Sequence, residues 1–572
     1  MASGTKRPRL GRDESAVERQ MRQVIRFLAD DSLKGRQPGT FGEEVAAAYV
    51  AAQMEELGLA PAGEDGTYFQ AVKMVGLTAQ QEASKLAFRV KDFQITGKFG
   101  DDFVHSMDHV EGAPPSCLLE SLDLVFVGHG VHSPAGLGWD DFKGESVAGK
   151  VLLVLISQPP VEPFPKEDMT YYGRWTYKFE EARRRGAAGC LILHFSDEFA
   201  GYPWSVTRTG YSGEKVALAA SGAGGASHPL ALHGWLTRVM GEKLAEAAGT
   251  SLDAWVASAQ RPDFRPSKVG CVSHSAEYAV RFFQGRNVLG ALPGLSEKHR
   301  HEAVVIAGHH DHLGEREGEI YNGAVDNCTG VAMMLATARL LLESGEALDR
   351  SVIFMAPTAE ECGLLGSEFY AKAPTPIEPN GPKPQFLAAF AFDVGNVWGK
   401  TRDLSVLGFG KSTLDPILQE AAASLEMRII PDQQPKMGLF YRSDHWSFVR
   451  CGVPGCWFFF GKEFVDKPPG YFEQVVGKYI QSEYHKPADT YRPEWTMEGL
   501  KSQVDYTVEV VRLLSRRLAL YPKLLPESAQ IQPPPPVPDM PDGQSWRRRP
   551  KKSLGFGLRC FDCKVEGCAC FL

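Results

Sequence analysis

The chain lacks the long apolar run that a membrane-spanning helix needs. No stretch of 18 or more consecutive apolar residues occurs, although 43% of the 572 residues are hydrophobic, and a transmembrane helix requires about 20 such residues. The basic residues Lys6 to Arg9 are followed by no apolar segment, so the chain as written predicts no secretory signal and a cytoplasmic location. A different natural N-terminus would leave export open. We interpret the basic residues as a solvated tail in preference to a nuclear address.

An excess of positive charge is also missing. The formal net charge is −8 and the isoelectric point is near 6.1. This balance argues against nucleic acid or an anionic membrane as the default partner. The length and composition are typical of a globular protein with two or three domains. The oligomeric state is left open.

Cysteine is sparse and occurs in an odd number, eleven. Cys190 lies in an apolar run and is typical of a small core residue, so reduced thiols in an intracellular compartment are favoured over a disulfide framework. The last thirteen residues hold Cys560, Cys563, Cys568 and Cys570. Their spacing is too tight for an ordinary zinc ribbon, and we favour an unstructured tail over a further metal site.

Periodicity divides the chain into regions. Val17, Met21 and Leu28 recur at helical spacing, and Thr40 with Glu43 predicts a capping box at the start of a second helix. Short apolar strands separated by Gly, Pro and Asp follow, and from Asn287 strands and helices alternate regularly. This alternation predicts an α/β fold with a mostly parallel, mixed sheet flanked by helices. The predicted limits are a tail at 1–20, a discontinuous α/β domain at 21–99 and 271–525, a β-rich insert at 100–270, and a Pro-rich linker with a disordered tail at 526–572.

Acidic residues gather where an α/β enzyme places its site. Glu360, Glu361 and Asp393 each come just after a buried strand, and Asp326 lies in a loop at the start of a helix. Open α/β sheets form their sites at the carboxyl ends of strands. Carboxylates with nearby histidines can hold two adjacent divalent cations, and a spare glutamate beside them can move protons.

The histidine-rich segment 309–312 leaves two registers open. In an extended backbone His309 and Asp311 point to one side, and His310 and His312 to the other. Asp311 would then fix the tautomer of His309 through a hydrogen bond. Spacing alone does not choose between the two pairs.

Several segments resemble the dinuclear zinc aminopeptidase family, which includes bacterial leucyl aminopeptidases, glutamate carboxypeptidases and glutaminyl cyclases. The similar segments are AGHHDHLG (307–314), NGAVDNCTG (322–330), TAEECGLLGS (358–367), RSDHWSF (442–448) and YHKPADT (484–490). They occur in family order, and the resemblance spans roughly residues 20 to 520. It implies the zinc-exopeptidase fold.

The resemblance also implies roles for individual residues. One zinc ion would be bound by His309 and Asp393, the other by Glu361 and His485, and Asp326 would bridge both; cobalt or manganese are possible substitutes. Glu360 would act as general base, with Tyr484 as a hydrogen-bond donor to the oxyanion and Asp311 behind the metal ligands. His309 is thereby favoured over His310 by resemblance alone.

The implied activity is a zinc-dependent aminopeptidase that acts on peptides. A carboxypeptidase or a glutaminyl cyclase-like acyltransferase on the same fold is the alternative, and a non-enzymatic, receptor-like scaffold is a weaker one. Residues 100–270 resemble the protease-associated domain found inserted in many such peptidases, through segments such as Val125–Val131 and Trp139–Phe142. That likeness implies a lid or substrate-access element.

Overall fold

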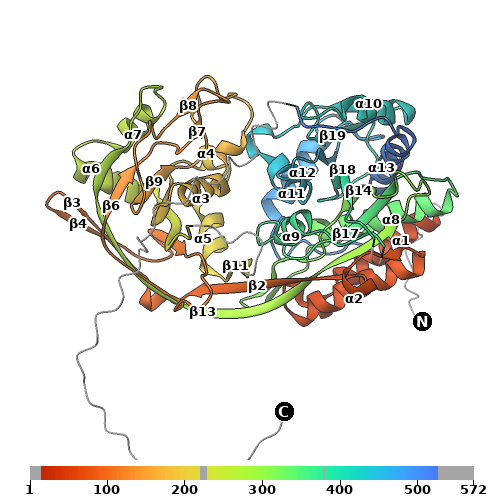
Figure 1. Ribbon diagram of the computed structural model, residues 1–572, viewed down its shortest axis with the longest axis horizontal. Helices are drawn as coiled ribbons and strands as arrows, with labels where there is room; N and C mark the ends of the chain where they lie inside the picture. Colours follow the sequence, from red (N-terminus) through yellow and green to blue (C-terminus); the bar gives the residue numbers. More distant parts are fainter. Residues whose placement is uncertain (1–13, 220–227, 379–380, 526–572) are drawn as a thin grey trace, which may run out of the picture. The chain divides into compact units, whose positions relative to one another are not determined.

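One long strand, β13 (Ser267–Leu292), belongs to two sheets (Figure 1). Its first half pairs with β3 (Lys85–Val90) and β6 (Ser116–Phe126), and its second half with β2 (Phe69–Ala79) and β17 (Ser351–Ala356). We call these the insert sheet and the α/β sheet. The computed structural model describes residues 14–219, 228–378 and 381–525. The predictions for the N-terminal basic residues and for the linker, tail and cysteines after residue 525 lie outside the described residues.

The α/β sheet is mixed, with a parallel centre. From β13 the order of strands is β17, β14, β18 and β21. Each neighbouring pair among these four strands runs parallel. β13 is antiparallel to β17, and β19 is antiparallel to β21, so antiparallel pairs flank the centre. The strands are β1 (Ala60–Pro61), β14 (Glu302–Ala307), β18 (Gln385–Ala391), β19 (Asp403–Leu407), β20 (Arg428–Ile430), β21 (Gly455–Phe460) and, paired with β2, β11 (Lys215–Leu218). The α/β class predicted from the alternation is confirmed.

Helices cover both faces of the α/β sheet. Successive side chains of a strand point to opposite faces, and in these buried strands both faces carry apolar side chains that pack against helices. Val304 and Ile306 of β14 belong to one core, whereas Val305 belongs to another that includes Tyr370 and Phe448. The helices of this part are α1 (Ala16–Leu28), α2 (Phe41–Leu57), α8 (Thr329–Glu343), α9 (Leu365–Lys372), α10 (Asp415–Ser424), α11 (His445–Val449), α12 (Tyr471–Ser482) and α13 (Glu498–Arg516).

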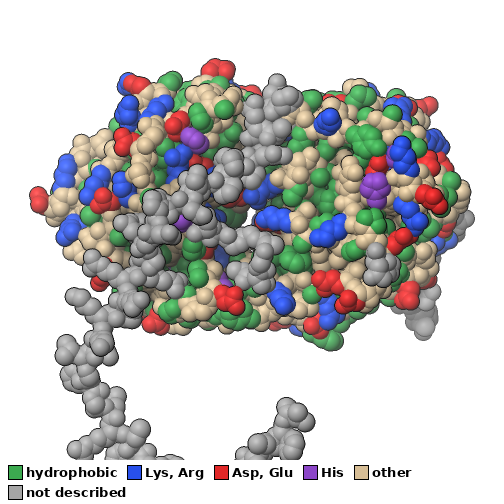
Figure 2. All heavy atoms as spheres, viewed as in Figure 1, with side chains coloured by type: hydrophobic (Ala, Val, Ile, Leu, Met, Phe, Trp, Pro, Cys, Tyr) green, Lys and Arg blue, Asp and Glu red, His purple; other side chains and the backbone are tan. Residues whose placement is uncertain are grey.

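The most apolar helical run lies in the core of this part. Among the described residues, the run Ala324–Glu343 is long and apolar enough to cross a membrane by length and composition alone. However, 83% of its apolar window is buried inside the protein, where α8 packs with α1 and α13. It is therefore a core helix of this fold. The face shown in Figure 2 carries basic and acidic side chains interspersed.

The insert sheet begins before residue 100. The hairpin of β3 and β4 (Phe93–Gly97), which the sequence analysis grouped with the α/β domain, pairs with the first half of β13. From there the order is β6, β9, β10, β12 and β5, with β6, β9, β10 and β12 parallel. The remaining elements are β5 (Phe103–Ser106), β7 (His132–Ser133), β8 (Trp139–Asp140), β9 (Val151–Leu155), β10 (Gly189–His194), β12 (Leu232–Thr237), α3 (Trp175–Arg184), α4 (Asp197–Ala200), α5 (Trp204–Ser212), α6 (Arg238–Ala248) and α7 (Leu252–Ala259).

The predicted capping box on α2 is wrong, although the helix itself is present. The side chain of Thr40 makes no capping hydrogen bond, and its hydroxyl donates to the Gln37 carbonyl instead (2.6 Å). The Glu43 carboxylate is buried and accepts a hydrogen bond from Thr358 Oγ1 (2.9 Å). The Thr40 amide also donates to the Gln37 carbonyl (3.2 Å), while the second Glu43 oxygen accepts from the Gly39 amide (3.3 Å), so Thr40 and Glu43 do not cap each other. A true capping box occurs at α1, on Ser15 and Glu18.

Candidate metal centre

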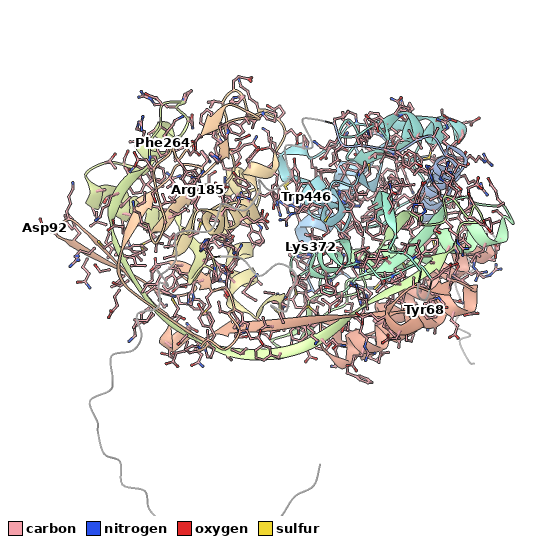
Figure 3. The ribbon with its side chains drawn as sticks, viewed as in Figure 1. Tyr68, Asp92, Arg185, Phe264, Lys372 and Trp446 are labelled. Carbon is pink, nitrogen blue, oxygen red and sulfur yellow. The ribbon has the colours of Figure 1, made fainter. Side chains whose placement is uncertain are left out.

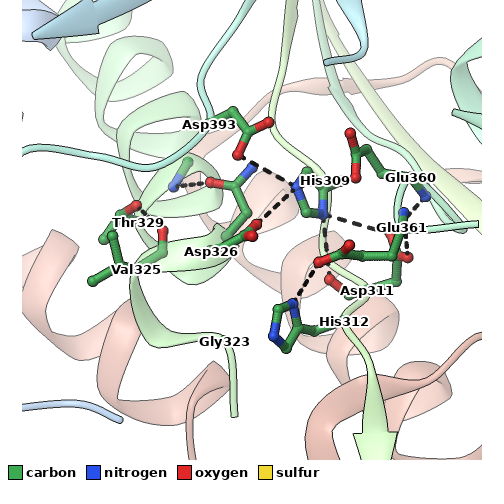
Figure 4. Close-up of polar contacts among 12 residues, drawn as sticks. His309, Asp311, His312, Gly323, Val325, Asp326, Thr329, Glu360, Glu361 and Asp393 are labelled. Carbon is green, nitrogen blue, oxygen red and sulfur yellow. Dashed lines mark hydrogen bonds and ion pairs between the residues drawn. The ribbon is translucent and has the colours of Figure 1, made fainter. Parts of the chain in front are cut away.

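Parallel neighbouring strands bring the predicted ligands to one edge of the α/β sheet (Figure 4). His309 follows β14, Glu360 and Glu361 follow β17, and Asp393 follows β18. Because β17, β14 and β18 are adjacent and parallel, the segments after them emerge at the same edge. Asp326 lies in the turn that directly precedes α8.

The first group of donors surrounds His309. Its Nε2 lies 3.4 Å from Asp326 Oδ1 and 3.7 Å from Asp393 Oδ1. One donor atom of each of these three residues lies within 4.8 Å of the other two, and all three side chains are buried. One nitrogen and two carboxylate oxygens at this separation can share one divalent cation.

The second group contains one residue more than the sequence predicted. His485 Nε2 lies 3.1 Å from Asp326 Oδ2 and 3.2 Å from Glu361 Oε2, as a shared metal site requires. His312 Nδ1 lies 2.7 Å from Glu361 Oε1, and His312 forms a second ligand-like group with Asp326 and Glu361. The two oxygens of Asp326 thus face different donor groups. This is the arrangement expected of a bridging carboxylate.

The side chains of segment 309–312 do not alternate between two sides as predicted for an extended backbone. His309 and His312 both face the site, whereas His310 points to Glu43, with Nε2 3.4 Å from Oε1. The loop bends because the buried Arg36 guanidinium donates to the His310 carbonyl (2.8 Å), while the His312 amide donates to the Arg36 carbonyl (3.3 Å). No motif in the sequence signals this role of Arg36.

Asp311 connects the first ligand segment to the predicted base. Its fully buried carboxylate accepts hydrogen bonds from the backbone amides of Glu360 (3.1 Å) and Glu361 (3.3 Å). Its Oδ1 also lies 3.7 Å from His309 Nδ1. Asp311 therefore positions three site residues at once, as carboxylates behind metal-binding histidines do.

Asp489 holds the bridging residue, a role that sequence reasoning missed. Its carboxylate accepts from the backbone amides of Val325 (2.9 Å) and Asp326 (3.1 Å). The peptide bond between Asp326 and Asn327 is cis. Asp489 lies in the segment 484–490 quoted for its histidine, so the signal was present in the sequence but was given no function.

The charges of this edge are not balanced by protein groups alone. Burial, together with the charges of Asp393 and Glu361, raises the pKa of Glu360 well above its usual value. Burial also raises the pKa of Asp393, and that of Asp444 to about 7. Crowded buried carboxylates are costly unless cations neutralise them.

The unsatisfied atoms at this edge fit bound cations. Among the described residues, the buried atoms without a hydrogen-bond partner include His309 Nε2 and His312 Nε2. Imidazole nitrogens mixed with carboxylate oxygens are the donors that zinc prefers in catalytic sites. The residues present therefore fit two zinc ions, one on each side of Asp326.

A cavity of about 480 Å³ opens onto the donor groups. Its lining includes Glu360, Asp393 and Tyr484, and the Tyr484 ring stacks on His485 with 3.9 Å between centroids. All eight predicted site residues thus lie at or directly behind one cavity. The insert lines it as well, and its Tyr171 contacts Trp446 of the α/β part (centroids 5.0 Å apart), which Figure 3 labels on the side facing the insert.

Comparison with known proteins identifies the segment that carries these residues. Residues 287–504 match the model of peptidase family M28, and they include all eight predicted site residues. Similar solved structures include an aminopeptidase from Aneurinibacillus sp. strain AM-1, which is 17% identical over 87% of this chain and 93% of that one (TM-score 0.44). A zinc aminopeptidase from Bacillus subtilis is 18% identical over 90% of this chain and 99% of that one (TM-score 0.41). A peptidase M28 precursor from Shewanella amazonensis is 16% identical over 87% and 95% (TM-score 0.40).

Proposed function

Because residues 287–504 match the model of peptidase family M28, we propose that the protein is a zinc-dependent aminopeptidase that releases N-terminal residues from peptides. One observation carries the proposal more than any other. The two carboxylate oxygens of Asp326 face separate donor groups, His309 with Asp393 and Glu361 with His485. This is the geometry that two adjacent metal ions need for hydrolysis.

The residues around the donor groups suit the proton transfers of peptide hydrolysis. Two zinc ions, when bound, supply Lewis acidity and make water a stronger acid. Glu360 lies beside this position, with Oε2 3.7 Å from His309 Nε2. In the proposed reaction its carboxylate accepts the proton of the attacking water and then delivers it to the departing amine. Asp311 fixes the Glu360 backbone for this task through the Glu360 amide.

Tyr484 suits the stabilisation of developing negative charge. Burial raises the pKa of its hydroxyl well above the usual value, so the hydroxyl keeps its proton at neutral pH. Its ring stacks on His485 and faces the same cavity. A preorganised hydroxyl in this place can donate a hydrogen bond to the oxygen of the scissile carbonyl as that oxygen becomes charged.

The test compares substrates that differ in which terminus is free. Zinc-loaded protein is expected to hydrolyse aminoacyl arylamides and to leave N-blocked peptides that end in glutamate intact. Turnover of the blocked glutamyl peptides alone would replace the aminopeptidase assignment with a carboxypeptidase. Metal analysis of the same sample separates both from a scaffold: we expect two zinc ions per chain, and none at micromolar zinc would contradict enzymatic function.

A further inference from the structure

Two arginines line the cavity without a carboxylate partner among the described residues. Arg174 comes from the insert, directly before α3, and Arg442 lies in the α/β part between Tyr441 and α11. The Nε atoms of both, and Nη2 of Arg442, are buried and have no hydrogen-bond partner within the described part of the chain. Guanidinium groups remain charged at all ordinary pH values, so leaving their donors unpaired is costly without a ligand.

Arg174 and Arg442 line one cavity, and their positive charges act on each other. Burial, and then the positive charge of Arg442, lowers the pKa of Arg174 to about 9. The charge of Arg442 also opposes the rise that burial causes in the pKa of Tyr484. Both arginines line the same cavity as Glu360 and Asp326. They therefore face the space that a substrate at the metal centre would occupy.

The other arginines of the cavity wall are satisfied by protein groups. Arg183 forms two hydrogen bonds with Asp108 (2.6 and 2.7 Å), and Arg450 Nη2 lies 3.1 Å from Glu180. Those ion pairs explain why Arg183 and Arg450 can be buried in the cavity wall without a ligand. Arg174 and Arg442 have no such ion pair among the described residues. The described part of the chain therefore supplies no carboxylate partner for Arg174 and Arg442, and a bound ligand can supply one.

We propose that Arg174 and Arg442 together bind a carboxylate group of the substrate, so that the enzyme selects peptides with a negative charge in this part of the cavity. The inference rests on the proposed peptidase function and adds the substrate class. A guanidinium group matches a carboxylate with two parallel N–H donors, and two such groups enclose it from two sides. Since Arg174 belongs to the insert, the insert takes part in substrate selection.

A carboxylate in a short peptide has two sources, and three substrates separate them. Leu-Leu carries a free C-terminal carboxylate, Asp-Leu-amide carries a side-chain carboxylate, and Leu-Leu-amide carries neither. We expect one of the first two to exceed Leu-Leu-amide in kcat/KM by about 10- to 100-fold, the range expected for hydrogen bonds between charged groups. Preference for Leu-Leu identifies the C-terminus as the recognised group. Preference for Asp-Leu-amide identifies an acidic side chain.

The variants Arg174→Gln and Arg442→Gln test which residues cause the preference. Each is expected to bring the kcat/KM ratio of carboxylate to amide substrate close to 1, and Arg442→Lys to restore part of it. Arg402→Gln removes an exposed arginine outside the cavity and should keep the ratio. Dissociation constants for the three peptides, measured by calorimetry on zinc-loaded Glu360→Gln with and without each arginine substitution, should follow the same pattern.

The outcomes distinguish this inference from the function on which it rests. If wild-type protein hydrolyses none of the three peptides and no aminoacyl arylamide, the proposed function fails. If it hydrolyses all three peptides with similar kcat/KM, the function stands and the arginine inference is overturned. The inference is equally overturned if a folded Arg442→Gln variant, checked by circular dichroism, keeps the full preference in both turnover and binding.

Discussion

Many charged and titratable groups are buried in the insert and at the edge of the α/β sheet that carries the donor groups, here called the catalytic edge. The two regions differ in what pairs with these groups. In the insert, Asp108 is paired with Arg183, and the buried Lys178 ammonium donates to the carbonyls of His129 and Tyr172, each at 2.6 Å. At the catalytic edge, carboxylates crowd together and histidine nitrogens remain unpartnered among the described residues. The Asp108 and Lys178 contacts in the insert need no cation, whereas the crowded carboxylates of the catalytic edge are neutralised only with cations.

The histidines show the same difference. In the insert, burial and the neighbouring His274 lower the pKa of His105 to about 2, so its ring is neutral and hydrogen-bonds Ser84 and Tyr278. At the catalytic edge, burial alone would lower the pKa of His485, but the carboxylates of Glu361 and Asp326 raise it to about 10. The surrounding carboxylates favour a positive charge at this edge, which zinc ions held by these residues would supply.

Replacing the bridging carboxylate should have the largest effect. Asp326→Ala removes an oxygen donor from both groups, so we expect loss of both zinc ions and a fall in kcat/KM of more than about 1000-fold. Zinc content by mass spectrometry and the arylamide assay measure both. Asp108→Asn in the insert is the matched control and should keep two zinc ions per chain. Two retained ions in Asp326→Ala would remove the distinction between the regions.

Proton transfer by Glu360 should be separable from zinc binding by the metal ligands. Glu360→Gln keeps the size of the side chain but cannot accept a proton, so kcat should fall by about 100- to 10,000-fold while two zinc ions stay bound. Steady-state kinetics with metal analysis on the same preparation provides the measurement. Rates like those of the wild type would show that another group is the base.

A change behind the ligands should have a smaller effect. Asp311→Asn weakens acceptance from the amides of Glu360 and Glu361, so zinc affinity should fall by about 10- to 100-fold without loss of the fold. Competition with a chelator gives the affinity, and circular dichroism checks the fold. Unchanged affinity would contradict the positioning role of Asp311.

Acid should weaken the insert before the metal-loaded catalytic edge. Burial lowers the pKa of His129 to about 3 and, more than any other cause, that of His233 and His274 to about 4. These rings are neutral in the fold, whereas the unfolded chain takes up protons below its ordinary histidine pKa near 6.5. Stability is therefore present above that pH and is lost as the pH falls. Between pH 7.5 and 5.5 the loss should be about 1 kcal/mol for each histidine.

Hydrogen exchange locates that loss. Amides of β12 and β10 in the insert should exchange faster at pH 5.5, after correction for intrinsic rates, than those of β14 in the zinc-loaded protein. Equal protection in the two regions at both pH values would contradict the assignment of neutral, buried histidines to the insert.

Much of the α/β part was predictable because its signals are local. The buried strands at Val304, Val352 and Phe386 and the helices between them have the composition of such elements, and the structure contains each of them. The acidic residues directly after these strands were therefore assigned to one edge of the sheet. The predicted capping box failed because the amide and the hydroxyl of Thr40 both donate to the Gln37 carbonyl, while one Glu43 oxygen accepts from the distant Thr358.

Distant contacts decided the rest of the site. The alternation rule applied to residues 309–312 assumes an extended chain, but Arg36 bends this loop so that His309 and His312 face the same centre. Arg174 had no signal, because its place in the cavity depends on how the insert packs on the α/β part. Arg442 lay in the segment 442–448, which was quoted for its family resemblance and was given no role.

The sequence by itself determined the alternation of strands and helices and the order of the acidic and histidine residues, because hydrophobic period and strand-end position are local properties. Only the tertiary structure decided that the two oxygens of Asp326 face different donor groups, that His312 joins Glu361, and that arginines from two regions share one cavity. These contacts depend on the packing of segments far apart in the chain, which no local pattern encodes.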